Sequence, residues 1–150
     1  FEDKRIPFFG GIFDILNPKT ISMNSKITHH IKISVRVEYD SRNSSPVNES
    51  FYFRYYIDIE NLRNQPIKLL KRKWVVYDTG FGFTEVSGDG VIGLTPEITS
   101  GEIFTYFSNV NIHSGIGYMQ GKYLFIDTET EDTFEVEIPK FNLISKVLNN

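Results

Sequence analysis

The sequence predicts an all-β domain, an immunoglobulin-like or fibronectin type III-like β-sandwich of seven or eight strands. Apolar and polar side chains alternate along several short segments, and turn-forming residues separate these segments. Of the 150 residues, 13 are Phe, 8 are Tyr and one is Trp, and aromatic residues favour strands over helices. A convincing apolar stripe of helical period is absent from the sequence. A closed β-barrel is the alternative architecture.

Strict alternation predicts the first two strands. From Ile31 to Asp40 the odd-numbered side chains are apolar or aromatic and the even-numbered ones are polar, as in a strand with one wet face. From Phe51 to Glu60 the odd-numbered side chains again line one apolar face. Residues 41–50 are rich in Ser and Asn and lack an apolar period, so we expect a long exposed connection there.

A third strand is expected over residues 67–78, after a turn. The adjacent apolar residues Leu69 and Leu70 break its alternation, as an inserted residue does in a ladder. This break predicts a β-bulge between Leu70 and Lys73. Beyond the bulge, Trp74 is expected to face the sandwich core.

The second half of the chain carries shorter alternating segments. A tight turn is expected over residues 87–90 and an acidic hairpin tip over residues 128–132, and Pro139 would end the last strand. The strands expected here are residues 83–86, 91–94, 102–110, 117–127 and 133–139.

The sandwich domain is expected to cover residues 23–150. Residues 1–22 show no period of either kind and are punctuated by Pro and Gly, so we expect an N-terminal appendage or leader. The sequence leaves open whether this appendage belongs to the native domain. Its longest apolar run, residues 6–13, is too short to cross a bilayer, so no membrane span is expected.

Composition excludes several classes of function. The chain has no cysteine, which excludes a disulfide framework, a thiolate zinc site and a cysteine nucleophile, and fits a cytoplasmic protein. With a formal net charge of −3, it is not expected to bind nucleic acid. A nucleophile elbow, a metalloprotease helix and a Walker loop are all absent, so neither an enzyme nor a cofactor is expected.

The residues Gly88, Asp89, Gly90 and Gly93 match the spacing of the dinucleotide-binding motif G-x-G-x-x-G. In that motif the phosphate lies at the start of a helix, and Pro96 leaves no room for one. A hairpin whose glycines adopt positive φ explains the same residues. The alternative is an anion, pyrophosphate or a nucleotide, bound by the loop amides.

Two further sets of side chains are candidates for contact with a ligand or partner. A basic run beside Trp74 is expected to be a solvated face, or else to bind phosphate or a protein partner. Three side chains that point outward on the second strand are of the types enriched at protein interfaces. The two sets are Lys71, Arg72 and Lys73, and Tyr52, Arg54 and Tyr56.

Metal sites are not expected. The acidic hairpin tip departs from the calcium-loop pattern at two positions, so a charged turn is expected there, with weak divalent-cation binding as the alternative. Its acidic residues are Asp127, Glu129, Glu131 and Asp132. His29 and His30 are adjacent and would point apart on an extended chain, and His113 is distant in sequence.

Over about residues 27–148 the chain resembles the ApaG domain family. The resemblance is carried in order by YFRYYIDIEN, PIKLLKRKWVVYD, VSGDGVIGLTP, SGEIFTYFS, GYMQGKY and FEVEIPKFNL. The chain departs from the family at Lys73, where a histidine commonly precedes the tryptophan, and at Ser108 and Asn109, where serine-glycine is usual.

The resemblance implies a fibronectin-like sandwich that acts as an interaction module, with no established catalytic activity. Bacterial members of the family are associated with cobalt and magnesium tolerance. We therefore expect a non-enzymatic module that binds an unidentified protein partner. The alternative is a small-ligand protein that binds pyrophosphate, a nucleotide or a divalent cation.

Overall fold

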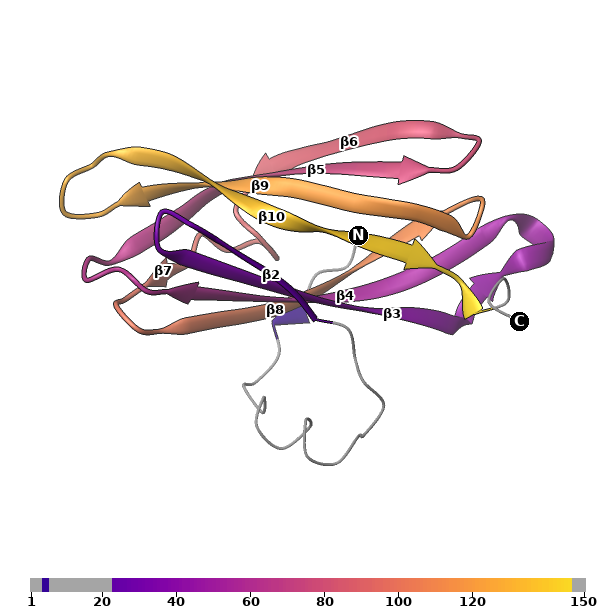
Figure 1. The fold of residues 1–150 in the computed structure, drawn as a ribbon, viewed down its shortest axis with the longest axis horizontal. Coiled ribbons are helices and arrows are strands. Elements are labelled where there is room, and N and C mark those ends of the chain that lie inside the picture. The colour runs from indigo at the N-terminus through magenta and orange to yellow at the C-terminus, as the bar shows by residue number, and fades with distance from the viewer. Residues whose placement is uncertain (1–3, 6–22, 147–150) are drawn as a thin grey trace, which may run out of the picture.

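The computed structural model describes residues 4–5 and 23–146, and these residues form two antiparallel sheets packed face to face (Figure 1). The predicted all-β sandwich is confirmed. Within the described residues, the regular structure consists of ten strands and one short 3₁₀ turn, η1 (Pro46–Asn48). The described residues include no helix of the length and hydropathy needed to cross a membrane.

The first sheet has the strand order β1-β8-β4-β3-β2. Its central strands are paired over long runs, with β4 held between β3 and β8. Its members are β1 (Lys4–Arg5), β2 (Met23–Thr28), β3 (Ile31–Ser45), β4 (Ser50–Asn61) and β8 (Ile103–Ile112).

The second sheet has the strand order β10-β9-β5-β6, and a short strand also pairs with β5. Its members are β5 (Ile67–Asp78), β6 (Gly82–Asp89), β7 (Glu97–Ile98), β9 (Ile116–Asp127) and β10 (Thr133–Ile144). The chain passes between the sheets from β4 to β5, from β7 to β8 and from β8 to β9. These crossings let strands distant in sequence share one core.

The predicted bulge is confirmed, because the β5–β9 register shifts between Leu69 and Lys71. Beyond it, Trp74 is only 3% exposed. Its ring lies 5.3 Å from Tyr55, 6.0 Å from Phe141 and 6.4 Å from Tyr123, measured between centroids. The tryptophan therefore joins strands of both sheets, as expected for the core of such a sandwich.

Several local expectations were wrong. Pro139 does not end the last strand, because β10 continues to Ile144 with a register shift between Ile138 and Phe141. Residues 41–45 are not a connection, because β3 continues to Ser45 and pairs there with Ser50. Polar contacts support this extended hairpin, including a hydrogen bond from Tyr52 N to Ser44 Oγ (2.9 Å). Residues 91–94 are not a strand but a turn closed by Val91 and Leu94.

Three strands escaped sequence reasoning, namely β1, β2 and β7. The side chains of β2 are mostly exposed, and β7 is only two residues long, so neither strand shows an alternating pattern. In β1, Lys4 pairs with Phe107 and Arg5 with Tyr106. The rest of the expected appendage, residues 1–3 and 6–22, lies outside the described residues.

Candidate functional site

The glycine motif is divided between a strand and a turn. Gly88 and Asp89 lie in β6, so the tight turn expected over residues 87–90 is wrong, whereas Gly90 and Gly93 have φ of +58° and +73°. The amide of Gly90 donates to Leu70 O, and those of Val91 and Leu94 donate to each other's carbonyls, all at 2.8 Å. Three loop amides are thus used within the fold, which opposes an anion nest at this loop.

The basic run is split by the alternation of β5. Arg72 points toward the inner side, and its Nη1 donates to Asp89 O (2.9 Å) and Gly90 O (2.8 Å). Lys71 is exposed, and Lys73 Nζ lies 3.7 Å from Glu85 Oε1. The structure therefore brings the basic run and the glycine motif together, but Arg72 binds the loop carbonyls and supports the turn.

A small cavity lies between the sheets beside Arg72. Its volume is about 20 Å³, and Trp74 and Ser108 contribute to its wall. The Ser108 hydroxyl is buried there without a hydrogen-bond partner. A space of this size holds about one water molecule, so it is too small for a nucleotide or pyrophosphate.

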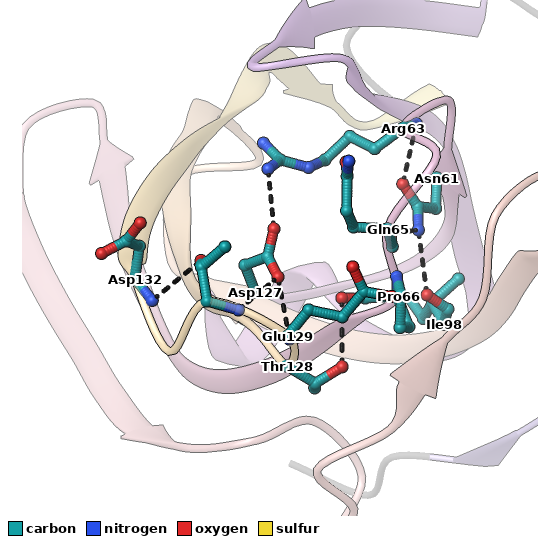
Figure 2. A network of polar contacts seen from close by, with 10 residues as sticks. Asn61, Arg63, Gln65, Pro66, Ile98, Asp127, Thr128, Glu129 and Asp132 are labelled. Atoms are coloured by element: carbon teal, nitrogen blue, oxygen red, sulfur yellow. Dashed lines mark hydrogen bonds and ion pairs between the residues drawn. The ribbon is translucent and has the colours of Figure 1, made fainter.

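The acidic hairpin tip is organised around Asp127 (Figure 2). Its Oδ1 accepts the amides of Glu129 (2.9 Å) and Thr130 (3.1 Å), and its Oδ2 accepts Arg63 Nη2 at 3.0 Å. The pKa of Asp127 is lowered, first by the Thr130 amide and then by the Glu129 amide and Arg63, although burial acts to raise it. Both carboxylate oxygens thus have partners within the fold.

The same network extends to the β4–β5 connection (Figure 2). The buried Asn61 donates through Nδ2 to Gln65 O (2.8 Å) and Ile98 O (3.0 Å), and its Oδ1 accepts the Arg63 amide (2.9 Å). The Arg63 guanidinium also lies 4.8 Å from the Phe134 ring centroid. The network therefore joins loops of both sheets at one end of the sandwich.

The three histidines are not brought together. His29 and His30 form the β2–β3 turn, and His29 packs edge-on against Phe134. His113 lies against Asp78, whose carboxylate accepts the His113 amide at 2.7 Å and the His113 Nδ1 at 3.0 Å. Over residues 23–146, no group of three or more His, Asp or Glu side chains is placed to bind a metal ion.

The expected partner-facing side chains Tyr52, Arg54 and Tyr56 lie half-buried on the outer face of the first sheet. The Arg54 guanidinium lies 4.9 Å from the Phe107 centroid, and Arg36 lies 4.2 Å from that of Tyr56. These contacts form a band of stacked arginines and aromatic rings.

A hollow of about 370 Å³ lies beside this band at Arg54. It is lined by charges of both signs, including Glu38, Asp40 and Arg42. The Asn43 side chain donates to Asp40 at 2.6 Å and is the main cause that lowers the pKa of this carboxyl. The hollow therefore has no single charge preference.

Sequence reasoning missed an exposed aromatic cluster formed by Tyr77, Phe83 and Tyr118. Together with Phe81 of the adjoining β5–β6 turn, we call it the aromatic patch. Tyr77 lies 4.9 Å from Phe83 and 5.1 Å from Tyr118, between ring centroids. Phe81 and Phe83 are 57% and 66% exposed. Phe81, in the turn between β5 and β6, and Phe83, in the strand expected after it, were the available signal.

The edges of the aromatic patch are apolar and basic. Ile116 and Ile144 are 44% and 42% exposed and are paired across β9 and β10. Lys140 Nζ lies 3.9 Å from the Tyr118 centroid, and His113 stacks on Phe81 at 4.9 Å. Exposed aromatic and apolar side chains of this kind are typical of a macromolecular contact site.

The sequence pattern of the ApaG domain matches residues 41–127, which is more than half of the chain. The chain belongs to the ApaG domain family. This ApaG match includes the glycine motif, the basic run and all four residues of the aromatic patch.

Relatives and a solved structure agree with this family. Protein ApaG of Vibrio cholerae serotype O1 is 41% identical over 120 residues, covering 79% of this chain and 94% of that protein. Protein ApaG of Salmonella arizonae is 40% identical over 111 residues, covering 74% of this chain and 88% of that protein. The crystal structure of a Bordetella pertussis protein described as ApaA matches with a TM-score of 0.74 and 32% identity, covering 77% of this chain and 94% of that one.

Proposed function

We propose that this ApaG-family chain is a non-enzymatic binding module that recognises a protein partner through the aromatic patch. The observation that supports the proposal is the exposure of Phe83, at 66%, beside Tyr77 and Tyr118, and of Phe81, at 57%, in the adjoining β5–β6 turn. Aromatic side chains at the centre of an interface carry much of the binding free energy. Burial of the two phenylalanines would remove a large apolar area from water.

Local contacts also favour this proposal over binding of a small ligand. Three amides of the glycine loop donate hydrogen bonds to backbone carbonyls, and Arg72 Nη1 donates to the carbonyls of Asp89 and Gly90 in the same motif. At the acidic tip, Asp127 is occupied by Arg63 and two amides. These groups stabilise the sandwich, whereas the aromatic patch presents apolar surface to the outside.

Capture of partner proteins from the source cell by the immobilised chain tests the proposal. The variant combining Phe81→Ser with Phe83→Ser removes the two most exposed rings of the patch. We expect it to reduce the amount of captured partner at least about tenfold, because hot-spot aromatics contribute about 2 kcal/mol or more each. Thermal unfolding should show that the variant remains folded, since exposed substitutions usually change stability by about 0.5 kcal/mol.

The matched control combines Tyr52→Ser with Tyr56→Ser on the outer face of the first sheet. It removes two aromatic rings from the other side of the sandwich, and we expect capture to be unchanged. Equal capture by the wild type and the Phe81/Phe83 variant would contradict the proposal. Loss of capture only in the control would show that the partner binds the outer face of the first sheet instead.

A further inference from the structure

The two edges of the second sheet differ in how they are covered. At one edge, β10 packs against the first sheet, where Lys26 forms an ion pair with Glu137 and Asn24 Nδ2 donates to Lys140 O at 2.9 Å. At the other edge, β6 is the last strand in the sheet order (Figure 1). Over the part of the chain that the structure describes, no further strand pairs with β6.

The hydrogen-bond pattern determines which groups of β6 face outward. The amide of Gly90 donates to Leu70 O at the end of the β5–β6 ladder. Because successive residues of an antiparallel strand direct their backbone groups to opposite edges, those of Phe83, Glu85, Ser87 and Asp89 point away from β5. An added strand would hydrogen-bond to Phe83, Glu85 and Ser87, whereas the carbonyl of Asp89 already accepts Arg72 Nη1.

The composition of β6 lacks two of the usual protections of an edge strand. Lysine and proline, which commonly prevent an edge strand from pairing, are absent from Gly82–Asp89. Phe83 continues the aromatic patch to the edge, and the Glu85 side chain is 63% exposed, with its carboxylate 3.7 Å from Lys73 Nζ. The edge therefore combines pairing capacity, an exposed aromatic ring and negative charge.

We propose that β6 binds an extended segment of the protein partner as an added antiparallel strand, with an aromatic side chain opposite Phe83 and basic side chains opposite Glu85 and Asp89. This inference rests on the proposed function and specifies the partner's chemistry. The antiparallel direction follows every pairing in the two sheets. Directly opposite residues of unlike charge, and pairs of aromatic residues, stabilise such an added strand.

Charge complementarity also disfavours a second copy of this chain as the occupant. If the β6 strands of two copies paired antiparallel with Ser87 opposite Ser87, Glu85 of one copy would lie opposite Asp89 of the other. If they paired about Glu85, that carboxylate would face its own copy. If they paired about Val86, Phe83 would face Asp89. Like charges directly opposite each other destabilise a ladder, so a basic segment fits this edge better than another β6.

Fluorescence anisotropy and NMR with the full chain and a labelled peptide test this inference. The peptide Lys-Val-Thr-Val-Lys-Thr-Phe places its residues opposite Asp89 through Phe83 in that order. We expect saturable binding, with the largest amide shifts along β6, and affinity at least about tenfold higher than for the same peptide with both lysines replaced by glutamate. Absence of saturable binding at millimolar peptide, or equal affinity for both peptides, would overturn the inference.

Two variants locate the contact. Ser87→Pro removes an outward amide without removing a β5–β6 hydrogen bond, and should weaken binding of the lysine peptide at least about tenfold, whereas Ser87→Thr should not. Glu85→Lys should weaken the lysine peptide and strengthen the glutamate peptide. Unchanged binding by Ser87→Pro would exclude strand addition at β6.

The outcomes separate this inference from the proposed function. If Ser87→Pro captures the natural partner normally while the Phe81/Phe83 variant does not, the protein-binding function stands and strand addition is wrong. If light scattering shows a dimer that Ser87→Pro dissociates, the occupant is a second copy and the inference is also wrong.

Discussion

At the residue scale, the charged side chains that most resemble ligand-binding groups form hydrogen bonds with backbone groups of the fold. Arg72 looks like a phosphate-binding residue beside a glycine motif, yet its Nη1 donates to two carbonyls of the following turn. Asp127 looks like a cation ligand, yet it accepts two amides and one guanidinium. Buried or half-buried backbone groups need partners, and these charged side chains supply them.

Gly90 is predicted to be the glycine of the motif that tolerates substitution least. A Cβ there would lie 2.0 Å from Leu94 O, and the residue has φ of +58°. We expect Gly90→Ala to lower the free energy of unfolding by about 3 kcal/mol or more, because a steric clash adds to the cost of left-handed backbone.

Gly93→Ala is the matched control, since φ is +73° but no atom lies within 4 Å of its Cβ. It should cost only about 1 kcal/mol. Urea denaturation measures both values, and equal costs would contradict this assignment.

At the element scale, a turn is stabilised by the elements it meets. The β9–β10 hairpin is tied to the β4–β5 connection by Arg63 and by Thr128, whose amide donates to Pro66 O at 3.2 Å. The two connections lie at the same end of the sandwich (Figure 1). The acidic composition of residues 128–132 predicted a turn, whereas the contact with Arg63 depends on how the sheets pack.

The Asp127 contacts predict a specific dependence of stability on pH. Because amides and Arg63 lower its pKa in the folded chain, its ionised form stabilises the fold above the unfolded pKa of about 4. This stabilisation is lost as the pH falls through the lower folded pKa. We expect Asp127→Asn to reduce the melting temperature at pH 7 and to flatten its decline below about pH 4.

Thermal melts between about pH 2 and pH 7 measure this effect. Asp132→Asn is the control, since it removes an exposed carboxylate from the same hairpin while the Asp127 contacts remain. A steep acid decline retained in Asp127→Asn would show that another group is responsible.

At the scale of the whole molecule, aromatic contacts join the two sheets. Tyr106 of β8 and Tyr123 of β9 are almost fully buried, and their hydroxyls are 2.5 Å apart. Trp74 packs against Tyr55 of the opposite sheet and against Tyr123 of its own. The core is thus partly specified by a polar contact between sheets as well as by apolar burial.

A double-mutant cycle with Tyr106→Phe and Tyr123→Phe tests this link. Each single change should cost about 1–2 kcal/mol, because it leaves a buried hydroxyl without this partner. The double variant should cost about 1 kcal/mol less than their sum. Tyr56→Phe lies on the outer face of the first sheet, so its combination with Tyr123→Phe should be additive. Additivity of the core pair would contradict the coupling.

The sequence by itself determined the fold class, the bulge near Leu70, the inward position of Trp74 and the family. The structural features follow from the local alternation of apolar and polar residues. A strand's side chains change face at every residue, and an inserted residue interrupts this pattern. The exposed strand β2 and the two-residue strands β1 and β7 lacked that pattern, so pairing alone revealed them.

Only the tertiary structure decided how the candidate residues are used. The contact of Arg72 with the glycine turn, of Arg63 with Asp127, and of Tyr77 with Tyr118 each joins segments distant in sequence. Such pairs depend on the order and register of the strands. The local composition of the sequence does not determine either for strands that are distant along the chain. For the same reason the aromatic patch and the open edge of β6 become visible only when the sheets are assembled.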